Sequence, residues 1–200
     1  MKITYANKLL NEIEANLEIV LLKRSKYLKT NNMFLKEKKL YVKIPNYKFY
    51  TITEIITNVI KYINKINKYQ SIKIALYGIT NKKIQALIDG LLLGSYDFVR
   101  YKSKIKEIKL KEIFIANENY QELQISYEEI KLKINNHIII NKNINLTREI
   151  INSVADDTTP EKISSWIKEE LENTNIECLI KDKNYIRTEL PAFYDISKGS

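Results

Sequence analysis

The chain has 200 residues, is 44% hydrophobic and carries a formal net charge of +9. Its 14 tyrosines, 5 phenylalanines and many isoleucines exclude a mainly disordered chain, because disordered chains are poor in aromatic and β-branched residues. The basic charge alone does not indicate a nucleic-acid-binding protein, since lysine far outnumbers arginine and A+T-rich codons produce the same bias toward Ile, Lys, Asn and Tyr. The single cysteine, Cys178, excludes an internal disulfide and a metal site of the cysteine type.

The first residues do not have the form of a signal peptide, because Glu12, Glu14 and Glu18 interrupt their apolar stretch. The chain also lacks the run of ~20 uncharged apolar residues that a membrane-spanning helix needs. We therefore expect a soluble, cytoplasmic protein without a membrane segment.

Strand-like patterns recur along the first 115 residues. Residues 19–22 form a short apolar run, as in a buried strand, and residues 39–45 alternate and end on a proline, as in an edge or half-buried strand. Residues 71–78 and 107–115 predict two further strands.

Helical periodicity lies between these strands. Thr51 and Glu54 have the spacing of a capping box, which predicts a helix start. A second helix is predicted from Thr80 or Asn81 to Gly94. The predicted apolar faces consist of Ile56, Val59, Ile60, Ile63 and Ile66 in the first helix, and of Ile84, Leu87, Ile88, Leu91 and Leu92 in the second.

A third helical tract is predicted from about Tyr120 to Ser153, with a break near Asn135 and Asn136. Strands that alternate with helices of this length predict an α/β fold with a mostly parallel or mixed sheet flanked by helices.

The last 50 residues have the pattern of a separate unit. Thr159, Pro160 and Glu161 predict a helix start, since Thr can cap, Pro lacks only a dispensable N–H, and Glu faces the positive helix end. Residues 176–180 and 191–200 predict two short strands. The expected buried face of the helix consists of Ile163, Trp166, Ile167 and Leu171. One helix and two strands cannot bury their own apolar faces, so the sequence is expected to be truncated.

Three stretches carry a resemblance to a known family: residues 89–103 (DGLLLGSYDFVRYKS), residues 145–161, which contain NLTREIIN and TTPE, and residues 192–200 (AFYDISKGS). In this order and spacing they resemble leucyl aminopeptidases, also called cytosol aminopeptidases. The resemblance extends from about Ser71 to Ser200.

The resemblance implies a macro-domain-like N-terminal domain at residues 1–140, a connecting helix at 141–158 and the start of a catalytic domain at 159–200. The sequence departs from the family's pattern at residues 153–157, at Glu189-Leu190-Pro191 in place of Gly-Met-Gly, and at Asp97, where the family usually has arginine. The changes in the two turns affect positions where Gly and Pro set particular φ angles.

Complete members of the family use two divalent metal ions, commonly zinc, manganese or magnesium, to hydrolyse the first peptide bond of a peptide. Their metal-binding motifs and assisting Lys and Arg lie beyond the stretch that resembles residues 192–200, and these motifs do not occur here. We therefore assign no catalytic, cofactor-binding or metal-binding residue and expect the chain alone to be inactive. The resemblance implies a role in assembly and access, with the rest of the catalytic domain, a homohexamer and peptide substrates as partners of the complete enzyme.

Residues that could suggest other chemistry have simpler interpretations. His137 is the only histidine and is expected to be structural or at the surface. Cys178 is expected to be an inert buried thiol, and Asp156-Asp157 a turn or helix start rather than a metal site. Gly90 and Gly94 lack the lysine of a phosphate loop and predict close packing.

Two other functions remain open on the sequence alone. One is a stand-alone binding module for nucleic acid or a nucleotide-type ligand, in which case the basic clusters 36–39 and 102–106 would be the first candidates. The other is a purely structural assembly domain. Without such a partner, these lysines are expected to be solvated surface charge, and Trp166 part of a core.

Overall fold

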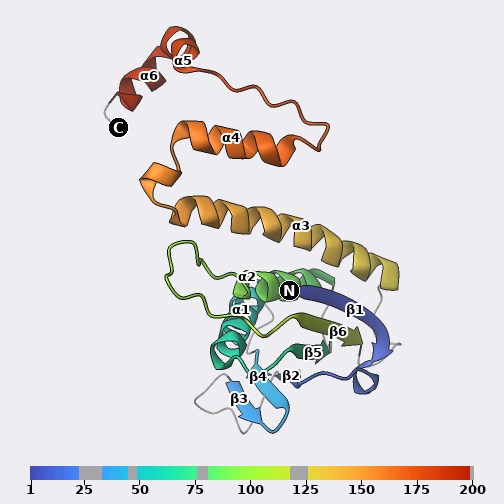
Figure 1. Ribbon diagram of the computed structural model, residues 1–200. Coiled ribbons are helices and arrows are strands. Elements are labelled where there is room, and N and C mark those ends of the chain that lie inside the picture. Colours follow the sequence, from blue (N-terminus) through green and yellow to red (C-terminus); the bar gives the residue numbers. More distant parts are fainter. Residues whose placement is uncertain (23–32, 45–48, 76–80, 118–125, 199–200) are drawn as a thin grey trace. The chain divides into compact units, whose positions relative to one another are not determined.

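The computed structural model describes residues 1–22, 33–44, 49–75, 81–117 and 126–198 (Figure 1). The chain divides into two compact units, Met1–Glu149 and Ile150–Ser200. Among the described residues, no helix is both long and apolar enough to cross a membrane.

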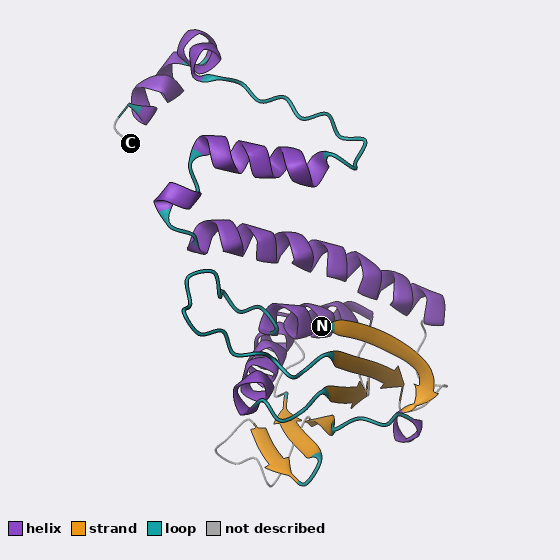
Figure 2. Ribbon diagram, in the orientation of Figure 1, coloured by secondary structure: helices purple, strands orange, loops and turns teal. Residues whose placement is uncertain are grey.

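The first unit is built on one six-stranded sheet, whose strands are drawn in orange in Figure 2. The strands are β1 (Lys2–Leu9), β2 (Leu17–Leu22), β3 (Met33–Lys36), β4 (Lys39–Lys43), β5 (Ser71–Ala75) and β6 (Glu112–Asn117). They lie in the order β1-β6-β5-β2-β4-β3, and all neighbours are parallel except the antiparallel pair β3–β4. The predicted mixed sheet is thus confirmed.

Three helices contribute to the core of this unit: α1 (Phe49–Ile66), α2 (Asn81–Gly94) and α3 (Tyr127–Asn152). Alternate residues of the strands, such as Ile72 and Ile74 of β5, belong to the same buried cluster as apolar residues of all three helices. The connections β4–α1–β5 and β5–α2–β6 join parallel strands, and α1 and α2 lie against each other beside the sheet (Figure 1). The predicted α/β fold with a helix-flanked sheet is therefore confirmed.

Two glycines let α1 and α2 approach each other closely. A Cβ atom built on Gly90 would lie 2.6 Å from Cβ of Ile56 and 2.8 Å from the carbonyl oxygen of Thr53. A Cβ on Gly94 would lie 2.7 Å from the carbonyl oxygen of Thr57. The prediction that these glycines serve packing is confirmed.

Two helix boundaries differ from the predictions. Helix α1 begins at Phe49, so Thr51 and Glu54 lie inside it and do not start it. The reason is that Ile52 is fully buried and extends the apolar face by one more turn toward the N-terminus. Helix α3 runs without a break through Asn135, because Ile130 and Ile134 hold one continuous face against the core.

The strands also differ in part. Strand β4 is half-buried but is not an edge strand, because the unpredicted β3 pairs with it and forms the edge. Strand β1 was not predicted either, although Ile3 and Tyr5 alternate in the pattern of a strand. The predicted strand at 107–115 begins only at Glu112, because Asn67 fixes the preceding segment to the end of α1.

Some predicted features fall on residues that the structure does not describe. They are the start of the third helical tract at Tyr120, Thr80 as a helix start, and the last residues of the predicted strand 71–78.

The second unit contains the end of α3, the short turn η2 (Ala155–Asp157), and the helices α4 (Pro160–Leu171), α5 (Lys183–Glu189) and α6 (Pro191–Ser197). Thr159 caps α4 by accepting a hydrogen bond from the backbone N–H of Lys162, and Pro160 opens the helix as predicted.

The strands predicted in the second unit are wrong. Residues 176–180 have no regular structure, and α6 occupies most of 191–200. A strand needs a neighbour to pair its backbone groups, and residues 150–198 contain no strand at all. The expected buried face of α4 is also absent: Ile167 is 47% exposed and Trp166 is half-buried, because no residue between 150 and 198 is buried.

Candidate functional site

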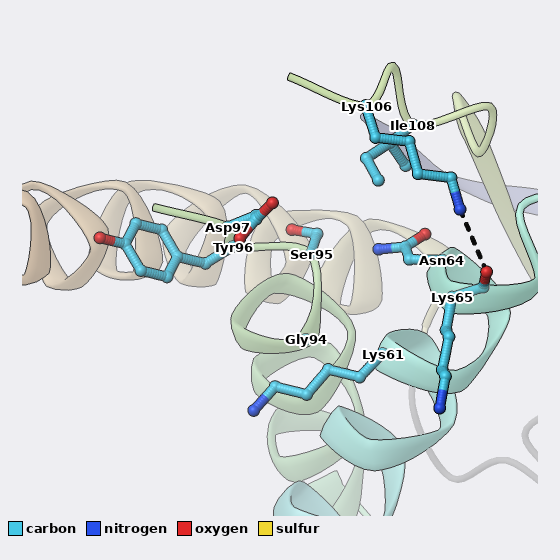
Figure 3. Close-up of a pocket in the computed structure, with 9 residues that line it drawn as sticks. All are labelled: Lys61, Asn64, Lys65, Gly94, Ser95, Tyr96, Asp97, Lys106 and Ile108. Atoms are coloured by element: carbon cyan, nitrogen blue, oxygen red, sulfur yellow. Dashed lines mark hydrogen bonds between the residues drawn. The ribbon is translucent and has the colours of Figure 1, made fainter. Parts of the chain in front are cut away.

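A hollow with a defined lining lies where α1 and α2 end (Figure 3). Its volume is about 420 Å³. It is lined by Lys61, Asn64, Lys65, Gly94, Ser95, Tyr96, Asp97, Lys106 and Ile108.

Two polar side chains of this pocket, Lys106 and Ser95, are engaged in ending the two helices. The Nζ atom of Lys106 donates to the carbonyl oxygen of Lys65 at 3.2 Å, as the dashed line in Figure 3 shows. The hydroxyl of Ser95 donates to the carbonyl oxygen of Leu92 at 2.7 Å. Lysines near a helix C-terminus also interact favourably with the negative end of the helix dipole. These contacts are those of helix ends and do not form an acid–base pair.

A polar cluster outside the pocket joins α2 to α3. One carboxylate oxygen of Asp89 accepts hydrogen bonds from Nδ1 of His137 and from the amide of Asn141, each at 2.7 Å. Because an ionised carboxylate can only accept, Nδ1 of His137 carries the proton. The side chain of Asn141 is 1% exposed and also donates to the carbonyl oxygen of His137 at 2.8 Å. This cluster gives His137 the structural role expected for it. The sequence offered no signal for the partner Asp89, which is 48 residues from His137 and 52 residues from Asn141.

The other residues of interest have local roles. Asp156 and Asp157 form the turn η2, and Nζ of Lys162 lies 3.6 Å from the Asp157 carboxylate and donates to the Asp156 carbonyl oxygen. The preference for a turn is therefore confirmed. Cys178, in contrast, is not buried as expected but half-exposed, since the segment 176–180 packs against no core.

The start of α4 perturbs one carboxyl group. Backbone hydrogen bonding to the Glu161 carboxylate and the hydroxyl of Thr159 hold the pKa of Glu161 below its usual range. Both donors stabilise the charged form. This is the chemistry of a helix cap and requires no ligand.

The basic clusters of the sequence are exposed. In cluster 102–106, Lys102 forms an ion pair with Asp97 at 2.7 Å. In cluster 36–39, Lys39 pairs with Glu18 at 3.0 Å, and Glu18 also faces Lys73 at 3.6 Å. The charges therefore lie at the surface, in part neutralised by carboxylates.

No metal-binding group is present among the described residues, where no three His, Cys, Asp or Glu side chains come together. In parallel α/β sheets, ligands bind beyond the carboxyl ends of the strands. Here the segments 23–32, 45–48, 76–80 and 118–125, which follow four of these ends, lie outside the described residues.

Comparison with curated proteins identifies relatives of one kind, although no family model matches. The chain is 30% identical over 144 residues to a probable cytosol aminopeptidase of Wolinella succinogenes, which covers 70% of this chain and 30% of that protein. It is 27% identical over 220 residues to a probable cytosol aminopeptidase of Campylobacter jejuni, covering 100% of this chain and 45% of that protein. The chain thus spans less than half the length of these relatives.

Solved structures agree on the fold. A mutant of tomato leucine aminopeptidase has a TM-score of 0.65 at 14% identity and covers 86% of this chain and 42% of that chain. A bottromycin maturation enzyme has a TM-score of 0.61 at 11% identity, covering 82% and 38%. At such identities the likeness concerns the fold alone.

Proposed function

Because the chain belongs to the leucyl (cytosol) aminopeptidase family, we propose that it is the N-terminal portion of an enzyme that removes N-terminal amino acids from peptides. The observation that carries this proposal is the alignment of the whole chain with 45% of the Campylobacter jejuni relative. The family is one of hydrolases, and the reaction of the complete protein is metal-dependent peptide hydrolysis.

We propose that three successive segments of the chain form three parts of the enzyme. Residues 1–140 form the macro-domain-like N-terminal domain, 141–158 the connecting helix, and 159–200 the start of the catalytic domain. Two observations support this division: the sheet with its core lies entirely within Met1–Glu149, and residues 150–198 contain no buried residue. A segment with so little core of its own is stabilised by packing against further polypeptide.

The residues described here do not fit the two metal ions of the complete enzyme, because they offer no cluster of three donors. We therefore place no step of the reaction on this span and expect the isolated chain to be inactive. Zinc, manganese or magnesium would bind in the remainder of the catalytic domain. The N-terminal domain would contribute to assembly of a cytoplasmic homohexamer and to substrate access.

A chimeric protein tests the proposal. Residues 1–198 would replace the aligned part of the Campylobacter jejuni relative, and hydrolysis of leucine p-nitroanilide would be measured with added manganese, together with the mass of the assembly. We expect activity and a mass close to those of the unaltered relative. The control is the relative without its aligned part, which should lose assembly.

Two results would contradict the proposal. One is a soluble, folded chimera that neither assembles nor hydrolyses the substrate. The other is metal-dependent hydrolysis by the isolated chain, because it would require metal ligands within these 200 residues.

A further inference from the structure

The sheet of the first unit has a second face, opposite to the buried cluster. The strand register places Thr4, Phe114, Lys73, Glu18 and Lys39 in one row across it. Ala116, Ala75, Val20, Tyr41 and Phe34 form the next row. Apart from the small, buried Ala116, these residues are half-buried or exposed.

The described helices leave this face uncovered. The residues that α1, α2 and α3 bury belong to the cluster on the other side of the sheet, together with Ile72 and Ile74 of β5. Among the described residues, the short turn η1 (Leu10–Glu12) and the residue after it reach this face, where Nζ of Lys73 donates to the carbonyl oxygens of Leu10 and Ile13. The β3–β4 end of the face lies away from this contact, across β2.

At that end, two aromatic rings lie side by side. Phe34 and Tyr41 are directly paired across β3 and β4, with ring centroids 6.5 Å apart and planes inclined by 30°. Phe34 is 45% exposed, although it is a large apolar side chain on a sheet face. Such a pair offers a flat apolar platform to a ligand.

Lysines surround the two rings. The stretch from Met33 to Lys43 contains four lysines and one carboxylate, that of Glu37. Lys36 and Lys43 alternate with the rings on the same face, and Lys38 lies in the exposed turn. In the part of the chain that the structure describes, no carboxylate pairs with any of these three lysines, whereas Lys39 pairs with Glu18. We call Phe34, Tyr41, Lys36, Lys38 and Lys43 the hairpin platform.

From this juxtaposition we propose that the hairpin platform binds single-stranded nucleic acid. Unpaired bases present flat faces that stack on aromatic side chains, and phosphates on the same strand attract lysines. In a duplex the bases are stacked on one another, so the rings would have no role. An acidic peptide would use the lysines but has no series of flat rings to match the platform.

The binding test uses the full chain and fluorescently labelled strands of twelve nucleotides. Fluorescence anisotropy at low salt would compare oligo(dT) with a duplex of the same length, an abasic strand and a poly-glutamate peptide. We expect oligo(dT) to bind at least roughly tenfold more tightly than the other three, because only it offers both phosphates and free bases.

Variants separate the two components of binding. Phe34→Val and Tyr41→Val keep strand-forming residues but remove a ring, and each should weaken binding roughly 5- to 150-fold. Phe34→Trp should retain binding. Replacing Lys36, Lys38 and Lys43 with glutamine should make the slope of log K against the logarithm of the salt concentration less negative by about 2.

A matched control carries the same change of charge elsewhere. Lys109, Lys131 and Lys168 are exposed and lie outside both basic clusters, and their replacement with glutamine should leave the salt slope and the affinity close to those of the unaltered chain. Circular dichroism would confirm that every variant is folded.

The proposal is overturned by any of four results: no binding of oligo(dT) at low salt, equal binding of the abasic strand, equal binding of the duplex or peptide, or equal effects of the two lysine triples. None of these outcomes depends on peptidase activity, so the proposal stands or falls separately from the proposed function.

Discussion

The close approach of α1 and α2 should make Gly90 and Gly94 intolerant of even one added methyl group. A Cβ on Gly90 would lie 2.6 Å from Cβ of Ile56 and one on Gly94 would lie 2.8 Å from Cβ of Ile60. Carbon atoms in contact prefer about 3.5–4.0 Å. The helices would therefore have to separate by about 1 Å, which disturbs the isoleucines buried between helix and sheet.

The magnitude follows from two opposing effects. Overpacking of a core costs about 1–3 kcal/mol. Replacing Gly by Ala within a helix recovers about 1 kcal/mol of propensity. Gly90→Ala and Gly94→Ala should thus each lower the free energy of unfolding by about 0–2 kcal/mol. Gly90→Val, which adds bulk without that full gain, should lower it by about 3 kcal/mol.

Urea unfolding followed by circular dichroism and tyrosine fluorescence is the appropriate assay. The only tryptophan, Trp166, lies in the second unit, whereas the sheet lies in the first. Asn58→Ala, at an exposed position of α1, is the control for helix propensity alone and should be slightly stabilising. Ile56→Ala should not rescue Gly90→Val, because Cβ of Ile56 and the carbonyl oxygen of Thr53 remain in place. The reasoning is refuted if Gly90→Val is as stable as the unaltered chain.

Three further predictions concern polar groups. Asn67, at φ 55°, donates to the carbonyl oxygen of Glu107 and accepts from the backbone N–H of Lys109. Asn67→Ala should lower the free energy of unfolding by about 1–3 kcal/mol, and Asn67→Gly should lower it less. Faster amide hydrogen exchange at residues 107–111 would show the loss of these hydrogen bonds. Asp89→Leu should cost about 1–3 kcal/mol, because the buried amide of Asn141 loses an acceptor, whereas unchanged exchange protection in α3 would contradict this role. Because the pKa of Glu161 is lowered, its carboxylate stabilises α4 fully at pH values above the usual carboxyl pKa, and this stabilisation is lost as the pH falls through the lowered pKa. NMR titration of the carboxyl group would measure the lowered pKa. Glu161→Gln should remove this dependence of α4 stability on acid.

The sequence predicted those elements whose pattern depends only on their own residues. The faces of α1 and α2 and the strands β2 and β5 were correct, because each has a local period that burial then obeys. Strand β1 escaped prediction although it has 8 residues, since its two buried residues, Ile3 and Tyr5, make too brief an alternation to predict a strand.

Features that depend on distant partners could not be predicted. Residues 176–180 have the composition of a strand, but composition does not say whether a neighbouring strand exists. The contact between Asp89 and His137 joins two residues that are 48 positions apart in the sequence and lie on different helices. The pairing of Phe34 with Tyr41 requires β3, which was not predicted. The site residues that matter most are therefore those that only the fold brings together.

The strand order also determines when each strand can pair during biosynthesis. Among the described strands, β1 pairs only with β6, and their register joins Lys2 to Glu112. A ribosome adds about 5–20 residues per second, so β1 must wait roughly 5–20 s for its neighbour. Strands β2, β3, β4 and β5 can assemble with α1 during that interval, while the apolar side of β1, with Ile3 and Tyr5, stays unpaired. Until β6 emerges, β1 of the nascent chain is therefore open to capture by chaperones.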